Sequence, residues 1–372
     1  EMYAGGKYNN DDGGDYEYSL GLNGLGACAT QYASEFMDVT VWRDGSKYSL
    51  HFEKGENIGG LKKEAADRKK TGTTIHWKPD LEVFTDINIP DEYFLDIMRR
   101  QAVVNAGVTF RFRSQKNGKF ETTDICYKNG ILDYVAELAG EDSLTQPVFI
   151  ESERRGRDRA DKPEYKVRMS AAFCFSNKAA VIEYYHNSSW LEHGGAPERA
   201  ARSAFVSAVD AQIKRAGKYQ KNESKVSWQD IADCLILVTN CFSTRTSYEN
   251  QTKKAITNKF IQEAMTEFFR SQLEIYFIEH KTEADRACDQ ILINKRSREQ
   301  AEKARLNIRK KLSGSLDISN RVAKFVDCRS RDAAKREIYI VEGDSALGAC
   351  KLSRDADFQG IMPVRGKILN CL

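Results

Sequence analysis

The stretch that decides the fold is the apolar run Leu235-Ile-Leu-Val-Thr-Asn-Cys-Phe242, together with the polar segment Tyr248-Glu-Asn-Gln-Thr-Lys-Lys254 that follows it. A short apolar run bounded by polar residues predicts a buried strand over 235–242. Beyond the polar segment, apolar residues recur at helical spacing over 256–277 and predict a long amphipathic helix that packs on a core. Strand, polar loop and helix in this order indicate an α/β arrangement, whose parallel strands need crossover connections.

Strands and helices alternate along the rest of the chain. The alternation over 39–52 predicts a hairpin around an Asp-Gly turn. Further strands are predicted at 72–77, near 110–127, and at 165–175, 179–185, 337–341 and 360–363, the run at 337–341 being buried. Helices are predicted at 28–36 and 131–138, through 205–213 with an end near Gly217, and for one turn after a capping box of Ser227 and Asp230. We expect a basic loop over 54–70 and a charged surface loop or hairpin tip over 154–162.

Length and composition limit the class of protein. The chain has 372 residues, enough for about two to three domains with packed cores. Apolar residues make up 41%, which excludes a disordered chain. No run approaches the ~20 apolar residues that span a bilayer, and Glu1 opens no signal peptide. We therefore expect a cytoplasmic protein without a membrane partner, cut from a longer chain.

The nine cysteines contain no CxxC pair, so a zinc ribbon is not predicted. Most of them lie in apolar runs, as Cys174 does in Ala-Ala-Phe-Cys-Phe, and we expect all nine to be small buried apolar residues in a reducing compartment. The five histidines are scattered and form no metal-binding pattern. His193, before Gly194-Gly195, is predicted to be a turn residue.

A glycine-rich loop before the first helix is the first candidate site. Gly21-x-x-Gly24-x-Gly26 allows backbone amides to approach phosphate oxygens, and a helix N-terminus favours an anion. A simple glycine-rich turn explains the same residues equally well. With Gly5-Gly6-Lys7 and the acidic, glycine-rich stretch 9–15 before it, the segment instead suggests a lid that closes over a nucleotide.

Three further segments carry chemistry. The pair Lys253-Lys254 suits a terminal phosphate, although a solvated helix start is the alternative. Glu342, before Gly343, follows a predicted strand, a position where a carboxylate can bind Mg²⁺ or transfer a proton. Such a site normally needs more carboxylates, and no Asp-x-Asp follows before Leu372. Residues 295–311 hold eight basic and two acidic side chains, for a charge of +6. They contact nucleic-acid phosphates or form a solvated helix with pairs such as Glu299 and Lys303, and both alternatives stay open.

Taken in order, five motifs resemble the B subunits of type IIA DNA topoisomerases, the family of gyrase and topoisomerase IV. They are Ala4-Gly-Gly-Lys-Tyr8, Gly21-Leu-Asn-Gly-Leu-Gly-Ala27, Gly72-Thr-Thr74, Gln251-Thr-Lys253, and Glu342-Gly-Asp-Ser-Ala346 with Pro363-Val-Arg-Gly-Lys-Ile-Leu-Asn370. The resemblance covers nearly the whole chain. It implies an α/β (α+β) fold: a partial Bergerat-type ATPase sandwich with its lid (1–118), a transducer domain with a βαβ crossover (119–290), a basic helical linker (291–330) and the opening of a Rossmann-like Toprim domain (331–372).

The resemblance also implies roles for individual residues. ATP would be held by the lid, the base pocket and the transducer, through Lys7, Tyr16, Gly21, Leu22, Asn23, Gly24, Leu25, Gly26, Thr73, Gln251 and Lys253. Lys253 would reach the terminal phosphate and take part in catalysis. Glu342 would be the catalytic glutamate and Mg²⁺ ligand of the Toprim site. Arg365 and Lys367 would lie beside the cleaved DNA.

The implied activity is ATP-driven passage of one DNA duplex through another. The implied partners are double-stranded DNA, a topoisomerase A subunit in an A2B2 heterotetramer, and a second copy joined through the ATPase domain. Family members carry further catalytic residues before Glu1 and after Leu372, and a glycine where Leu20 stands, so we expect this fragment alone neither to hydrolyse ATP nor to cut DNA. The alternative is a non-catalytic nucleic-acid-binding or assembly module. Other Bergerat ATPases lack a segment like 337–370, and the sequence does not separate gyrase from topoisomerase IV.

Overall fold

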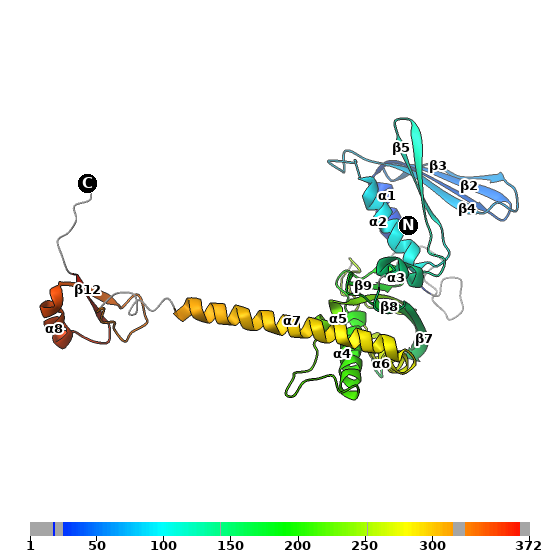
Figure 1. The fold of residues 1–372 in the computed structure, drawn as a ribbon. Coiled ribbons are helices and arrows are strands. Elements are labelled where there is room, and N and C mark those ends of the chain that lie inside the picture. The colour runs from blue at the N-terminus through cyan, green and yellow to red at the C-terminus, as the bar shows by residue number, and fades with distance from the viewer. Residues whose placement is uncertain (1–17, 19–24, 142, 251, 315–323, 365–372) are drawn as a thin grey trace. The chain divides into compact units, whose positions relative to one another are not determined.

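The computed structural model describes residues 18, 25–141, 143–250, 252–314 and 324–364, and the side chains of this set except those of 309–314. These residues divide into two compact units, Glu1–Lys295 and Arg296–Leu372. Helices and strands alternate in both, as predicted (Figure 1). No helix among the described residues is long and apolar enough to cross a membrane.

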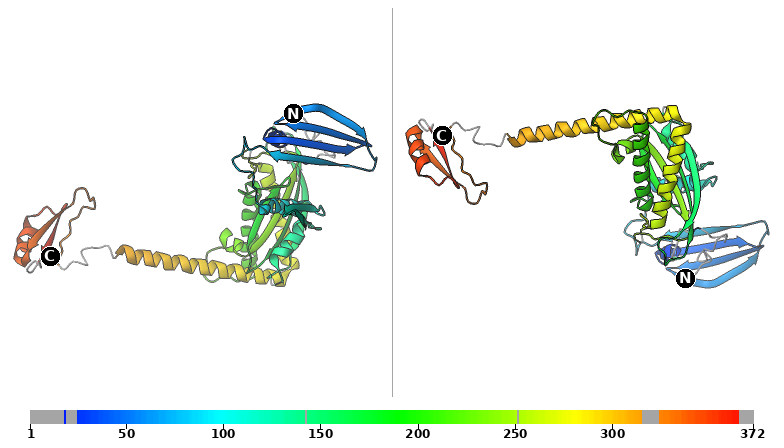
Figure 2. Two further views of the ribbon diagram at one scale, coloured as in Figure 1. Left: turned by 90° about the horizontal axis from the view of Figure 1, so that it is seen from above. Right: turned by 90° about the horizontal axis from the view of Figure 1, so that it is seen from below.

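A four-stranded antiparallel sheet with the order β3-β2-β1-β4 opens the first unit (Figure 2). Its strands are β1 (Ser34–Arg43), β2 (Ser46–Glu53), β3 (Glu56–Ala65) and β4 (Gly72–Pro79), preceded by α1 (Leu25–Tyr32). The hairpin over 39–52 is confirmed, with Asp44 and Gly45 at positive φ in its turn.

Two expectations for this region are wrong. The predicted loop over 54–70 contains β3, every residue of which is exposed. Its basic side chains face water while its backbone pairs with β2, so charge does not prevent a strand here. The predicted helix over 28–36 ends at Tyr32, and the chain enters β1 at Ser34, because Met37 is buried from a strand that β2 and β4 flank.

Next come α2 (Asp91–Val104), which the sequence analysis did not predict, and a separate hairpin of β5 (Phe110–Lys116) and β6 (Lys119–Ile125). The predicted sheet region near 110–127 is therefore confirmed as strands but does not belong to the first sheet. Phe94 of α2 stacks on Phe112 of β5, with 5.8 Å between ring centroids, so the hairpin packs against this helix instead.

A five-stranded sheet with the order β10-β9-β11-β8-β7 forms the centre of the first unit. Its strands are β7 (Val148–Gly156), β8 (Tyr165–Phe175), β9 (Val181–His186), β10 (Ser189–Trp190) and β11 (Leu235–Ser243), which confirms the strands predicted here. β9 and β11 are parallel, and the predicted crossover between them contains α4 (Ala196–Arg215) and α5 (Trp228–Ala232). The amide of Ser227 donates to Asp230 at 2.8 Å, as the capping box requires.

The two faces of this sheet bury two hydrophobic clusters. Side chains alternate along β11: Leu235 and Leu237 join one cluster, whereas Ile236 and Val238 join the other. The first cluster is covered by α4, α6 (Lys259–Glu279) and the start of α7 (Lys281–Gly314), and the second by α2 and α3 (Ile131–Ala139). The predicted long helix within 256–277 is thus confirmed as α6, and the sheet lies between two helical layers.

The cysteines only partly follow expectation. Cys174, Cys234, Cys241 and Cys288 are buried, but Cys126 is exposed and Cys28, Cys328 and Cys350 are half-buried. Cys126 directly follows β6, a strand in which every residue except Ile125 is exposed, and it is exposed as well. Cys371 lies outside the described residues.

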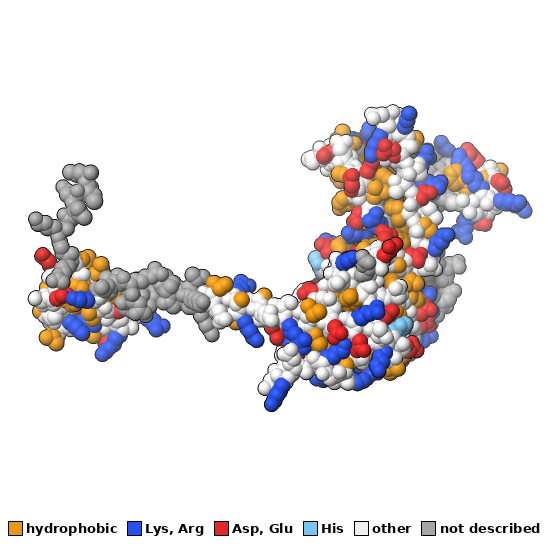
Figure 3. Space-filling model, viewed as in Figure 1, with side chains coloured by type: hydrophobic (Ala, Val, Ile, Leu, Met, Phe, Trp, Pro, Cys, Tyr) orange, Lys and Arg blue, Asp and Glu red, His pale blue; other side chains and the backbone are white. Residues whose placement is uncertain are grey.

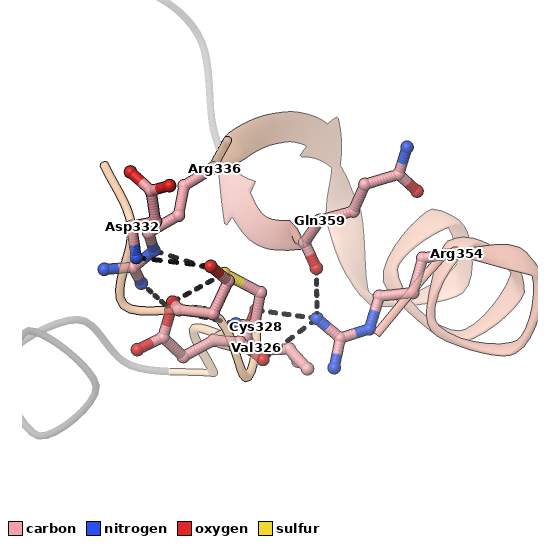
Figure 4. A network of polar contacts seen from close by, with 8 residues as sticks. Val326, Cys328, Asp332, Arg336, Arg354 and Gln359 are labelled. Atoms are coloured by element: carbon pink, nitrogen blue, oxygen red, sulfur yellow. Dashed lines mark hydrogen bonds and ion pairs between the residues drawn. The ribbon is translucent and has the colours of Figure 1, made fainter. Parts of the chain in front are cut away.

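The second unit contains β12 (Glu337–Glu342), α8 (Gly343–Ser353) and β13 (Gln359–Val364), which form a parallel βαβ unit. Figure 4 shows how Arg354 donates to the backbone oxygens of Val326 and Gln359, and how Arg336 contacts Cys328. The predicted burial of 337–341 is wrong: Ile338 is 59% exposed and Ile340 64% exposed, because no described element covers that face of β12.

The basic helix over 295–311 belongs to α7, which ends at Gly314 as predicted. Its first basic residue, Lys295, is fully buried, and its Nζ lies 3.2 Å from Glu223 Oε1. Lys295 is therefore neither a solvated residue nor exposed to nucleic-acid phosphates, the two alternatives for this segment. Lys295 is therefore a structural cation. Figure 3 shows Lys and Arg interspersed with Asp and Glu on the visible face of the first unit, so this face presents no patch of one sign.

We expect Glu223→Ala to lower the free energy of unfolding by about 3 kcal/mol, since it leaves the Lys295 ammonium buried without this partner. Urea unfolding measures the change. The matched control is Glu64→Ala, which removes the exposed partner of Lys47 at 3.1 Å and should cost under about 1 kcal/mol. Replacing both members, by Glu223→Leu with Lys295→Met, should restore much of the loss, and equal costs for Glu223→Ala and Glu64→Ala would contradict the interpretation.

Candidate functional site

The parallel pairing of β9 and β11 brings two polar segments together. Cα register pairs Cys241 with His186, and the two strands end at the same edge of the sheet. Beyond the strands, the Asn187 side chain continues the ladder: its Nδ2 donates to Ser243 O and its Oδ1 accepts from Ser243 N, both at 3.0 Å. The turn after β9 is thereby bound to Ser243, the last residue of β11.

The segment 244–258 that follows β11 is held as a closed loop. The Ser247 amide donates to Asn258 Oδ1 at 2.7 Å, and the Glu249 amide donates to Ala255 O at 3.0 Å. Asn258 in turn donates from Nδ2 to Asp158 at 3.0 Å, and Asp158 also accepts from the Phe260 amide at 2.9 Å. These bonds join the loop to the β7–β8 connection and to the start of α6, so its root is fixed.

Lys253 lies at the tip of this loop. Its φ is +59°, and its amide donates to Asn250 O at 3.2 Å. Its Nζ lies 5.8 Å from the centroid of the Tyr248 ring. Partial burial lowers the pKa of the Lys253 ammonium, which a nearby anion would oppose. The expected alternative, a solvated helix start, is wrong, since α6 begins only at Lys259.

The neighbouring Lys254 has a structural role. Its Nζ lies 2.5 Å from Glu192 Oε2, and its carbonyl accepts from the His193 amide at 3.0 Å. The next turn approaches the loop closely: a Cβ on Gly195, which has φ +85°, would lie 2.4 Å from Ile256 O. His193 is an exposed turn residue, as predicted, and the 192–195 turn fastens the loop to the start of α4.

His186 is a buried part of the same edge. Its Nε2 lies 2.8 Å from Thr246 Oγ1 and 3.2 Å from Ser243 Oγ. Its ring makes an edge contact with Tyr248, 6.3 Å between centroids. Burial lowers the pKa of His186 to about 3, so the imidazole is neutral at neutral pH. Neither His186 Nδ1 nor Tyr248 Oη has a hydrogen-bond partner among the described residues.

Sequence reasoning missed most of this support. It treated the histidines as scattered, because Thr246 lies 60 residues from His186 along the chain. It also gave no role to Asp158, whose partner Asn258 is 100 residues away. The one local signal was polarity directly after a buried strand, which marks Ser243 and the residues that follow.

The predicted nucleotide residues fall on several elements. Leu25 and Gly26 begin α1, which confirms that the glycine-rich segment leads into a helix. Thr73 lies on β4, exposed and paired in register with Val41. Their common contact with a nucleotide stays a prediction. The remaining predicted residues lie outside the described set: Lys7, Tyr16, Gly21, Leu22, Asn23, Gly24, Gln251, Arg365 and Lys367.

Glu342 ends β12, as predicted, and Gly343 follows with φ +78°. The carboxylate thus stands at the carboxyl end of a parallel strand, before α8. Asp344 lies 2.6 Å from Lys324 Nζ. The described residues contain no group of three acidic, histidine or cysteine side chains that would hold a metal ion. Glu342 by itself does not make a Mg²⁺ site, so its catalytic role stays a prediction.

Known proteins match this chain over almost all of its length. The sequence profile described as DNA gyrase B matches residues 130–307. The DNA gyrase B protein of Enterococcus faecalis is 30% identical over 373 residues, 99% of this chain and 56% of that protein. The DNA gyrase B protein of Chlamydia muridarum is 30% identical, over 99% of this chain and 45% of that protein. The chain spans about half the length of the curated relatives it matches.

Solved structures show the same architecture. The 43K ATPase domain of Thermus thermophilus gyrase B, in complex with an aminocoumarin, has a TM-score of 0.59 at 23% identity, covering 76% of this chain and 74% of that one. The topoisomerase IV ATP-binding domain of Francisella tularensis has a TM-score of 0.59 at 20% identity, covering 75% of each chain. These likenesses confirm the mixed α/β fold, whose structural neighbours are ATPase domains of the Bergerat type.

The fold of this chain is therefore like that of the solved ATP-binding regions of gyrase B and topoisomerase IV. In sequence, this chain is similar to DNA gyrase B proteins over 99% of its length, and the profile match covers residues 130–307.

The buried His186 gives a pH dependence. Its pKa is about 3 in the folded chain and about 6.5 when unfolded, so below pH 6.5 the unfolded state binds an extra proton. We expect this residue to lower the free energy of unfolding by about 1.4 kcal/mol for each pH unit between 6.5 and 3. Urea unfolding at pH 7.5, 6.0 and 5.0 measures the slope.

His186→Gln should reduce that slope relative to the wild-type chain. His193→Gln, at an exposed turn, is the control and should leave it unchanged. The comparison between variants also separates His186 from His51, whose pKa is raised by hydrogen bonds to Asp38 and Glu53 and whose titration works in the opposite direction. Equal slopes for wild type and His186→Gln would refute the assignment.

Proposed function

We propose that the whole protein is the B subunit of an ATP-dependent type IIA DNA topoisomerase, which couples ATP binding and hydrolysis to the passage of one DNA duplex through another. The observation that carries the proposal is Lys253: a half-buried ammonium at the tip of a loop fastened to three elements, in a chain that matches gyrase B over 99% of its length. Such a cation is suited to sense the terminal phosphate of a nucleotide.

The ATP-binding residues proposed are those of the lid, the base pocket and the transducer loop. Leu25 and Gly26 would present helix N-terminal amides to phosphate, and no described atom beyond the chain neighbours and the backbone of α1 lies within 4 Å of a Cβ built on Gly26. Thr73 would line the base pocket. Lys253, with Gln251, would lose its anionic partner on hydrolysis, and the backbone hydrogen bond from the His193 amide to the Lys254 carbonyl would carry the change to α4.

The second unit would supply the DNA-cleavage part of the activity. We infer that its parallel βαβ unit, with Glu342 at a strand end, opens a Toprim domain in which Glu342 binds Mg²⁺ together with ligands from beyond the described residues. Bound Mg²⁺ would supply charge stabilisation to strand cleavage and religation. Arg365 and Lys367 would contact the DNA.

The partners proposed are double-stranded DNA, an A subunit in an A2B2 heterotetramer, and a second copy joined through the ATPase domain. The proposed domains are the ATPase part (1–118), the transducer (119–290), the basic linker (291–330) and the Toprim opening (331–372). ATP binding would favour the closed form of the paired subunits. Hydrolysis would then return the population to the open form.

A non-catalytic nucleic-acid-binding module is the second candidate, favoured by a basic cleft. A cleft of about 650 Å³ lies at the root of the 244–258 loop and includes four cations, Arg159, Lys162, Arg245 and Lys259, with one carboxylate, Asp158. Asp158 already accepts hydrogen bonds from Tyr165, Asn258 and Phe260. The cleft therefore offers a cationic lining to phosphate groups without requiring turnover.

We expect the complete gene product, with its cognate A subunit, ATP and Mg²⁺, to change DNA supercoiling. Lys253→Ala should lower ATP hydrolysis about 10- to 100-fold, since a charge-assisted bond to phosphate is lost. The measurements are a coupled ATPase assay and plasmid topology on gels.

Lys254→Ala is the matched control, because it removes an adjacent ammonium that pairs with Glu192. Its ATPase rate should stay within about threefold of wild type. ATP-independent DNA binding without any change in topology would favour the non-catalytic module and reject the topoisomerase proposal.

A further inference from the structure

A separate cleft of about 450 Å³ lies beside the turn that follows β10. Its walls include three aromatic side chains, Tyr184 from β9, Trp190 from β10 and Trp228 from α5. Beside them lie the polar side chains of Glu192, His193, Glu198 and Arg202. Leu191 and Ile182 add apolar surface. None of its lining residues is among the residues predicted to bind nucleotide, metal or DNA.

The Tyr184 hydroxyl is the unusual group in this cleft. The residue is only 6% exposed, and its Oη has no hydrogen-bond partner among the described residues. Burial and Glu198 raise the pKa of this phenol, while Arg202 lowers it, so both charged groups act on the hydroxyl. A buried hydroxyl without a partner costs free energy, which a ligand that hydrogen-bonds to it would recover.

The charges around the cleft are already compensated. Glu198 lies 2.7 Å from Arg202, and Glu192 lies 2.5 Å from Lys254. The Arg202 guanidinium also lies 5.9 Å from the centroid of the Trp228 ring. An ionic ligand would have to compete with these internal pairs. Aromatic walls and one hydroxyl instead favour an uncharged, flat ligand with a polar edge.

We propose that this cleft binds an uncharged fused heterocycle with a ring carbonyl or ring nitrogen, whose face lies against Trp190 or Trp228 and whose polar edge hydrogen-bonds to the Tyr184 hydroxyl. This inference does not depend on the proposed topoisomerase activity. The site is connected to the Lys253 loop, because Glu192 pairs with Lys254 and the His193 amide donates to Lys254 O at 3.0 Å. A bound heterocycle therefore stabilises the loop over 248–258.

Ligand-observed NMR on the full chain tests the site, with theophylline, inosine and quinazolin-4-one as probes. Each is uncharged, fused and carries a ring carbonyl. We expect at least one to bind with a Kd below about 1 mM, and Tyr184→Phe to weaken that binding about three- to tenfold through the lost hydrogen bond. Tyr184→Phe should not lower the melting temperature, since the hydroxyl it removes has no partner among the described residues.

The matched control is the next residue along β9. Tyr185 belongs to the other hydrophobic cluster, and its hydroxyl donates to Glu183 at 2.8 Å. Tyr185→Phe should therefore leave the affinity unchanged and lower the melting temperature. Hydrogen exchange over 248–258 should slow when the probe is bound.

Three results would overturn the proposal. Failure of all three probes to bind would remove the site. Equal affinity for wild type and Tyr184→Phe would remove the role of the hydroxyl. Binding with unchanged exchange over 248–258 would remove the connection to the loop. Each of these results leaves the ATPase test of Lys253 unaffected, so the two proposals fail separately.

Discussion

The parallel pairing of β9 with β11 is the constraint on which the rest of the first unit depends. Parallel strands end at one edge of a sheet, so the turn at 187–188 and the loop at 244–258 are brought together although about 60 residues separate them. The crossover that parallel pairing requires is provided by α4 and α5. The same connection contains α4, which covers one face of the sheet. The hydrophobic core and the candidate site therefore both depend on the parallel pairing of β9 and β11.

The loop that carries Lys253 is stabilised from several directions, and this offsets the cost of its conformation. Asp158 and Asn258 hold its root, and Gly195 lets α4 approach Ile256 where a side chain would collide. Against these contacts stand the positive φ of Lys253 and two buried polar atoms, on Tyr248 and His186, without hydrogen-bond partners among the described residues. Strain of this kind persists only where the surroundings determine it, and such positions cluster at functional sites.

The sequence pattern was sufficient to predict an element when the apolar residues of that element form its buried face. The strands over 165–175 and 235–242 and the long helix within 256–277 were predicted because their apolar spacing reports burial directly. Local pattern failed where a residue distant in sequence determines the structure. β3 is polar but forms a strand because it pairs with β2, and Lys295 is basic but is buried in an ion pair with Glu223. For the candidate site, motif spacing identified Lys253 and Glu342. The supporting contacts of His186 and Asp158 could not be predicted, because their partners lie 60 and 100 residues away.

Glu342 and Lys253 are placed by similar strand topology, but the residue with positive φ differs between the two segments. Glu342 ends β12 and Lys253 lies in the loop that follows β11, and each of these strands has a parallel neighbour. After β12 the positive φ falls on Gly343, which adopts it without a steric cost. After β11 it falls on Lys253 itself, at a cost of about 1 kcal/mol. Glycine would relieve that cost but remove the ammonium. Lysine at this position therefore keeps an ammonium at the tip of the loop at the cost of a left-handed backbone conformation.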